Sequence, residues 1–271
     1  MFNCTRASGL TFLFPERDTV VGPTLQIYGE FAQPEVDFLV DVATAERGVF
    51  LDVGANIGAI ALPFARRRPG WRVTAVEAHR GLSAVLATNA LGNHLYNVEV
   101  VNAAAGPERA IADFPLVPLD AETNFGDSGF HRKAPRAATL QLPVDELAPE
   151  ADVIKVDVQG FEAEVLKGAS ATLAAGRAIW FIETPSEPAV RREVHDTFRS
   201  NGYGLFWFFS PFGTRRSPRG KATGQALGGD ANWVAAPAGR PSPWPLPPVR
   251  DPLEARPARA AEYPYLQRYG F

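Results

Sequence analysis

A glycine-containing turn is the first feature of the sequence with residue types suited to chemistry. Residues 52–58, with the sequence DVGANIG, follow a short apolar run and precede apolar residues at helical spacing. Glycines let a backbone turn tightly and approach a ligand without a Cβ in the way. The free N–H groups at the start of a helix can bind a carboxylate or a phosphate. We therefore expect the turn to contact a small anionic group through some or all of Asp52, Gly54, Asn56 and Gly58.

An acidic residue follows the next apolar run. Glu77 comes directly after residues 72–76, roughly 20 residues beyond Gly54, which is the distance expected of a nucleotide-binding unit. A carboxylate there can accept hydrogen bonds from the two hydroxyls of a ribose. The glycine spacing is Gly-x-x-x-Gly, whereas dinucleotide enzymes surround a pyrophosphate with Gly-x-Gly-x-x-Gly. S-adenosylmethionine has a ribose and a carboxylate but no pyrophosphate, so it is the predicted cofactor. The alternatives are a turn that serves only packing and an acid that is simply exposed.

The elements that would position these residues alternate between strands and helices. Apolar runs predict strands at residues 49–53, 72–76, 98–101, 152–158, 178–182, 203–209 and 232–236. Helical patterns follow most of these runs, including a charged helix at residues 188–200. Such alternation predicts an α/β fold, Rossmann-like, with a mostly parallel sheet and helices on both faces. Ligands of such sheets bind at the carboxyl ends of the strands, where the strand order reverses.

Composition narrows the class of protein. The chain has 271 residues, a formal net charge of −3 and 46% hydrophobic residues. A basic nucleic-acid-binding domain is not expected from this charge. Cys4 is the single cysteine, which excludes a disulfide scaffold and a Cys-rich zinc module. No apolar run has the length of a signal-peptide core or of a membrane span, so we expect a cytoplasmic protein.

The pattern divides the chain into three parts. We expect residues 1–47 to be an N-terminal segment that packs on the domain, and residues 48–237 to form the cofactor-binding domain. Residues 238–271 form a proline-rich C-terminal extension, in which residues 237–264 are predicted to be non-helical and to run extended over the surface. Its aromatic residues suggest that it packs across the domain, covers the acceptor site or docks on a second subunit to form a homo-oligomer. Residues 119–138 show no period and are predicted to be a long loop.

Three stretches resemble the FkbM-type methyltransferases, a class I S-adenosylmethionine-dependent family. They are LDVGANIG at residues 51–58, IKVDVQGFE followed by VLKGA at residues 154–169, and a weaker GEF at residues 29–31 with Glu35 beyond it. The sequence DANWV at residues 230–234 is similar to the family's closing strand. The family has Glu where this sequence has Gln159, which puts in doubt any role that needs a charge there.

The resemblance implies a function and a set of cofactor contacts. The turn at residues 52–58 would hold the methionine part of S-adenosylmethionine, and Glu77 would hold the ribose. Asn102 and Ala103 would lie by the adenine. The family's usual reaction is O-methylation of a hydroxyl, commonly on a sugar, a glycan or a secondary metabolite.

Methyl transfer from a sulfonium is an in-line displacement that requires a close, oriented acceptor and the exclusion of water. An alcohol is a poor nucleophile until its proton is removed, so a general base helps. Asp157, at the end of a predicted strand, is the candidate catalytic base; capping of the next helix or binding of the cofactor amino group are the alternatives. Asp157 and Glu183 could together hold magnesium. No third ligand is visible, so no metal is predicted.

The irregular loop and the strand end beyond it are candidates for acceptor binding. His131 could act as a base, and Asn124 and Ser128 could bind sugar hydroxyls, with Glu183 at the same sheet edge. The alternatives are a solvated histidine and residues that only form turns. Two rival functions also remain: a nicotinamide-dependent oxidoreductase, and an inactive cofactor-binding partner module.

Overall fold

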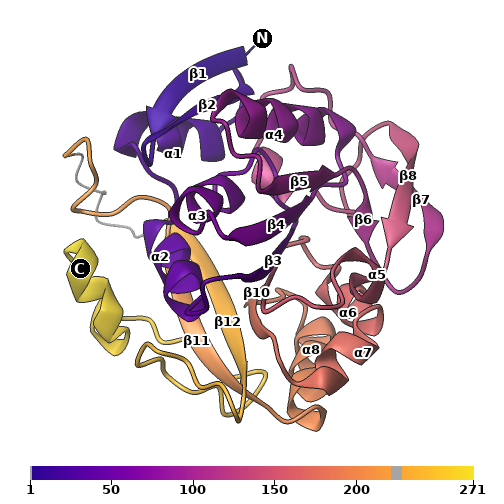
Figure 1. Ribbon diagram of the computed structural model, residues 1–271, viewed down its shortest axis with the longest axis vertical. Helices are drawn as coiled ribbons and strands as arrows, with labels where there is room; N and C mark the ends of the chain where they lie inside the picture. The colour runs from indigo at the N-terminus through magenta and orange to yellow at the C-terminus, as the bar shows by residue number, and fades with distance from the viewer. Residues whose placement is uncertain (1, 221–227) are drawn as a thin grey trace.

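The computed structural model describes residues 2–220 and 228–271. At its centre is a seven-stranded sheet with the order β11-β12-β10-β9-β3-β4-β5 (Figure 1). Strands β3, β4, β5, β9 and β10 are parallel, and β12 is antiparallel to both of its neighbours. The bounds are β3 Gly48–Val53, β4 Trp71–Val76, β5 Val98–Val101, β9 Val153–Val156, β10 Ile179–Glu183, β11 Tyr203–Pro211 and β12 Gly229–Pro237. The predicted α/β fold with a mostly parallel sheet is confirmed.

Helices cover both faces of this sheet. The crossovers from β3 to β4 and from β9 to β10 run in opposite directions, so right-handed connections place their helices on opposite faces. The helices are α2 Gln33–Val42, α3 Ala61–Arg67, α4 Arg80–Gly92, α5 Val144–Leu147, α6 Glu162–Lys167, α7 Ser170–Ala175 and α8 Pro188–Ser200. The order of strands reverses between β3 and β9, which is where ligands of such sheets bind.

The central strands are apolar along most of their length because both faces are covered. Phe50, Val73 and Phe181 are fully buried. Phe50 packs on Phe64 of α3 at 4.4 Å between ring centroids, so the first helix is anchored directly on the strand that carries the turn. The helix begins at Ala61, later than the apolar spacing predicted, and Pro63 lies in its first turn, where a missing N–H costs little.

Two smaller sheets stand beside the central one. An N-terminal hairpin pairs β1 Phe2–Ala7 with β2 Leu10–Pro15 and is followed by α1 Val21–Tyr28. A three-stranded sheet consists of β6 Ala104–Ala105, β7 Ala110–Pro115 and β8 Arg136–Leu142. Sequence analysis did not predict it. The long loop at 119–138 is confirmed only in part, because η1 (Phe125–Asp127) interrupts it and its last residues belong to β8.

The C-terminal extension packs across the domain beside α2 (Figure 1). Trp244 lies 5.4 Å from Phe38, and Tyr265 stacks on Phe208 at 4.6 Å between ring centroids. The prediction that residues 237–264 are non-helical is wrong at their end, where the short 3-10 helix η2 (Ala260–Glu262) forms. A second 3-10 helix, η3 (Pro264–Tyr269), follows beyond them. Within the described residues, no helix is both long enough and apolar enough to cross a membrane.

Candidate active site

Two neighbouring cavities open at the carboxyl ends of the central strands. We call the first cavity the one lined by Phe31, Glu35, Asp52, Asn56, Lys155 and Asp230, among others. We call the second cavity the one lined by Glu77, Ala103, Phe114, Ser128, Phe130 and Phe161, among others. Gly54 and Asp157 line both cavities. The end of β3 and the end of β9 therefore form the boundary between the two cavities.

The glycine turn and Glu77 meet, as the sequence predicted. The carboxylate of Glu77 accepts hydrogen bonds from the backbone N–H groups of Asn56 and His79, at 2.8 and 2.7 Å. Burial raises the pKa of Glu77 to about 7, against the opposing effect of these two donors. The turn needs glycine at Gly54, because its φ is +81° and an added Cβ would lie 1.9 Å from the carbonyl oxygen of Asp157. The backbone of Gly54 therefore lies directly against the carbonyl group of Asp157 at the end of β9.

Aromatic rings border the second cavity. Phe130 packs on Phe161 at 4.4 Å between ring centroids and on Phe114 at 5.1 Å. Ala103 adds a small side chain to the lining, and the Oγ of Ser128 is buried without a hydrogen-bond partner among the described residues. Apolar surfaces with one free hydroxyl suit a flat heterocycle that carries polar edge groups.

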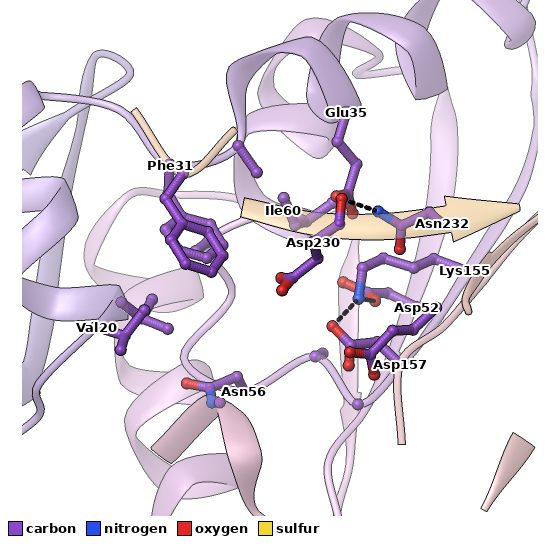
Figure 2. Close-up of a pocket in the computed structure, with 18 of the residues that line it drawn as sticks. Val20, Phe31, Glu35, Asp52, Asn56, Ile60, Lys155, Asp157, Asp230 and Asn232 are labelled. Atoms are coloured by element: carbon purple, nitrogen blue, oxygen red, sulfur yellow. Dashed lines mark hydrogen bonds and ion pairs between the residues drawn. The ribbon is translucent and has the colours of Figure 1, made fainter. Parts of the chain in front are cut away.

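A buried lysine organises the first cavity (Figure 2). The ammonium of Lys155 lies 3.1 Å from Oδ2 of Asp157 and 3.7 Å from Oδ1 of Asp52. Burial lowers the pKa of Lys155, but the surrounding carboxylates outweigh burial and raise it above its usual range. Burial raises the pKa of Asp157, but the Lys155 ammonium and neighbouring hydrogen-bond donors outweigh that effect and lower it. Asp157 is therefore ionised at neutral pH.

Gln159 links two carboxyl groups at the edge of this cavity. Its amide nitrogen donates to Oδ1 of Asp157 and to Oε2 of Glu183, both at 2.8 Å. Burial and the nearby Asp157 carboxylate raise the pKa of Glu183 well above its usual range. A glutamate in place of Gln159 would add a third carboxyl group and, when ionised, could not donate these bonds. The departure from the family sequence thus supplies a neutral donor between two acids.

A second group of hydrogen-bonded polar side chains includes Glu35 and Asn232, which also line the first cavity. Oε2 of Glu35 accepts a hydrogen bond from Ser210 at 2.9 Å, and Ser210 accepts one from Asn232 at 3.3 Å. Burial raises the pKa of Glu35 to about 8. Asp230, at the start of β12, lines the same cavity, and burial followed by the charge of Asp157 raises its pKa to about 7.

The structure separates the predicted site residues into three groups. Asp52, Gly54, Asn56, Asn124, Asp157 and Glu183 line the first cavity. Gly54, Glu77, Ala103, Ser128 and Asp157 line the second cavity. Ser128, predicted to contact the acceptor, lines the same cavity as Glu77 and Ala103.

The remaining three predicted residues line neither cavity. Gly58 faces the side chains of Leu62 and Leu86, where an added Cβ would lie 2.5 Å from Leu86. Asn102 is exposed, and its amide donates to the backbone oxygens of Glu77 and Ala78. His131 is exposed, and its Nε2 lies 3.4 Å from Asp127. Gly58 therefore serves the packing of the turn, and Asn102 holds the backbone after β4 by hydrogen bonds.

Four residues that line the first cavity are not among the site residues predicted from the sequence. They are Lys155, Glu35 and Asp230, together with Phe31, which stacks on Phe212 at 5.6 Å. A lysine inside the apolar run of β9 was the available signal for Lys155, since a lysine is almost never fully buried without a charged partner. Within residues 2–220 and 228–271, no three His, Cys, Asp or Glu side chains are placed to hold a metal ion together.

Comparison with known proteins places the chain in a family. Residues 52–205 match the model of the methyltransferase FkbM domain, which is more than half of the chain. The chain belongs to the FkbM family of S-adenosylmethionine-dependent methyltransferases. The match includes the glycine turn, Glu77, Lys155 and Asp157, whereas Glu35 and Asp230 lie outside it. Membership of a methyltransferase family argues against the alternative of a nicotinamide-dependent oxidoreductase.

Solved structures share the fold of this FkbM chain. A methyltransferase FkbM from Methylobacillus flagellatus KT has 17% sequence identity and a TM-score of 0.49, and the match covers 76% of this chain. The chain spans about half of that protein, 49% of its length. A SAM-dependent methyltransferase from Agrobacterium tumefaciens has 13% identity and a TM-score of 0.50, covering 87% of this chain and 70% of that one. No curated protein matches the chain.

Proposed function

We propose that this chain transfers the methyl group of S-adenosylmethionine to a hydroxyl oxygen of a sugar, a glycan or a secondary metabolite. One observation carries the proposal: Gly54 and Asp157 line both cavities. A ligand in each cavity would meet at the Asp157 carboxylate. In-line methyl transfer needs such a meeting point, with donor and acceptor held close together and away from water.

The residues of the second cavity fit the cofactor. The rings of Phe130 and Phe161 would contact the adenine, and the free hydroxyl of Ser128 offers a hydrogen bond to a polar edge of the nucleoside. Glu77 would accept hydrogen bonds from the ribose, and the turn that begins at Gly54 would hold the methionine part. When bound, S-adenosylmethionine supplies a methyl group on a positively charged sulfur.

Asp157 has the properties of a general base at the boundary of the two cavities. Its side chain is 31% exposed, although Lys155 and Gln159 each donate to one of its oxygens. Each carboxylate oxygen keeps a second lone pair, so the acceptor hydroxyl can donate its proton there. The Lys155 ammonium keeps Asp157 ionised before the reaction. The residues that contact Asp157 thus support deprotonation of the acceptor by this aspartate.

The test begins with binding of S-adenosylhomocysteine, the demethylated cofactor, measured by calorimetry. A methyl-acceptor screen of sugars and secondary metabolites follows, with Asp157→Asn as the variant. We expect the variant to retain S-adenosylhomocysteine binding and to lose about 10²–10⁴-fold in methyl-transfer rate, the usual contribution of a general base. Loss of cofactor binding in the variant would make Asp157 a cofactor ligand. Absence of cofactor binding by the wild-type protein would overturn the proposed function, and binding without any transfer would favour an inactive partner module.

A further inference from the structure

The first cavity has a large excess of acidic side chains. Its lining includes the carboxyl groups of Glu35, Asp52, Asp157, Glu183 and Asp230, and Lys155 is the one basic side chain among the described lining residues. Buried carboxyl groups are costly unless they are paired or hydrogen-bonded. A positively charged ligand would favour the ionised forms of these groups and offset the cost of their burial.

Lys155 forms no salt bridge with Glu35 or Asp230, two of the acids in this lining. Its ammonium is paired with Asp157 and Asp52. No Lys, Arg or His nitrogen in the described ranges is placed within 4.0 Å of the carboxylates of Glu35 or Asp230 as a salt bridge. These two side chains come from α2 and β12, outside the residues that match the family model.

Glu35 provides an independent sign of a missing ligand. The residue is 5% exposed, and its Oε1 has no hydrogen-bond partner within the part of the chain that the structure describes. Only Oε2 is satisfied, by Ser210. A buried acceptor left unpaired costs the full desolvation of that atom, so a donor from a ligand would recover it. Figure 2 shows the Glu35 carboxyl group pointing toward the space beside Asp230.

The cofactor's own ammonium does not account for this side of the cavity. Asp52 lies in β3 just before the glycine turn, and Asp157 follows the neighbouring strand β9, so both acids lie near the expected place of the methionine part. In Figure 2, Glu35 lies above the Lys155 ammonium and the Asp230 carboxylate lies to its left, whereas Asp157 lies below it. Glu35 and Asp230 therefore border a part of the cavity that Asp157 does not fill.

An aromatic wall completes this part of the cavity. The ring of Phe31 lines it and is stacked on Phe212, with ring planes 15° apart. An aromatic face attracts an ammonium group and also packs on the C–H face of a sugar ring. The wall thus suits a ligand that combines an amine with a carbon skeleton.

We infer that the methyl acceptor is a hydroxyl compound with a protonated amino group, such as an amino sugar or an amino alcohol, and that Glu35 and Asp230 bind its ammonium. The inference rests on the proposed function and adds the substrate class. With the ammonium held by these two acids, a hydroxyl of the same molecule would be directed toward Asp157.

Binding of an ammonium ligand would be linked to proton release. Burial raises the pKa of Glu35 to about 8, and burial with the Asp157 charge raises that of Asp230 to about 7. A ligand ammonium favours the ionised carboxylates, so protons leave the protein on binding near pH 7. The charged groups that act on these two acids are Lys155, Asp52, Asp157 and Arg256.

The test uses the protein saturated with S-adenosylhomocysteine, with a chelator present to exclude metal ions. Ethanolamine is titrated by NMR and calorimetry and is compared with two neutral analogues, N-acetylethanolamine and ethylene glycol. We expect ethanolamine to bind roughly tenfold more tightly or better, as a charged hydrogen bond predicts. Calorimetry in buffers of different ionisation enthalpy should show proton release for ethanolamine alone.

Variants locate the ammonium. Glu35→Gln and Asp230→Asn should each weaken ethanolamine binding by roughly tenfold and reduce proton release, with unchanged affinity for S-adenosylhomocysteine. Glu99→Gln removes the same charge from an exposed position on β5 and should change neither quantity. Retained S-adenosylhomocysteine binding shows that each variant is folded.

Three results would overturn the inference and leave the proposed function intact. They are the absence of ethanolamine binding by protein that binds S-adenosylhomocysteine, equal binding of the neutral analogues, and ethanolamine binding that neither variant weakens. Failure of the wild-type protein to bind S-adenosylhomocysteine would instead refute the proposed function itself.

Discussion

Replacement of Lys155 by methionine tests the electrostatics of the site most directly. Methionine keeps much of the unbranched side chain and removes only the ammonium, which lies 3.1 Å from Asp157 and 3.7 Å from Asp52. The buried Asp52 and the partly buried Asp157 would then lack their cation. Removing one partner of a buried ion pair costs about 3–5 kcal/mol. For a chain of this size each kcal/mol lowers the melting temperature by about 2–4 °C, so the expected loss is about 6–20 °C.

The loss should depend on pH in a defined direction. In the wild-type protein the pKa of Asp157 lies below its usual value, so Asp157 adds stability above that value and loses it as the pH falls. Without Lys155, burial raises the pKa of both acids, and the fold favours their protonated forms. The variant therefore loses stability as the pH rises above about 4, the ordinary pKa of an aspartate. Thermal unfolding should show a larger difference between variant and wild type at pH 8 than at pH 4.5.

Lys167→Met is the matched control. Lys167 is exposed on α6 and pairs with Glu164 and Glu193 at the surface, so its removal should change the melting temperature little at either pH. The reasoning is refuted if Lys155→Met loses no more stability than this control, or if its loss is the same at both pH values.

Three further changes test other parts of the structure. Gly54→Ala should abolish S-adenosylhomocysteine binding, because its Cβ would lie 1.9 Å from the carbonyl oxygen of Asp157. Gly160→Ala is the control, since Gly160 also has a positive φ but has open space around it. This control should lose only about 1–2 kcal/mol of stability and should retain binding. Calorimetry should show tighter S-adenosylhomocysteine binding at pH 8 than at pH 6, since only the ionised Glu77, whose pKa burial raises to about 7, accepts two ribose hydrogen bonds; a flat profile would contradict this role. Trp244→Ala should lower the free energy of unfolding in urea by about 3–5 kcal/mol, and a surface-like loss below 0.5 kcal/mol would show that the extension does not stabilise the domain.

The main sheet was predictable because its strands are buried on both faces. Runs such as residues 49–51 and 178–182 are apolar throughout, and turn residues or charged helices follow them. The pairing of the glycine turn with Glu77 was also predictable, because right-handed crossovers place consecutive parallel strands side by side. The small sheet was missed because β7 and β8 are half-exposed and carry weak patterns, and because a long loop separates them in the sequence.

The charge network was not predictable from spacing. Glu35 and Asp230 belong to α2 and β12 and come from opposite ends of the chain. They reach one cavity only because β12 inserts between β10 and β11 and α2 lies over that part of the sheet. Gln159 in the sequence shows a lost charge, whereas the structure shows an amide that joins Asp157 to Glu183.

The sequence by itself indicated the family, the strands of the central sheet, and the glycine turn with its acidic partner. Each of these depends on local apolar patterns or on residues close together along the chain. Only the tertiary structure decided that the site has two cavities that meet at Asp157, and that a buried Lys155 keeps this aspartate ionised. Burial and long-range charge pairing depend on which strand ends meet at the sheet edge, and that information is spread over the whole chain.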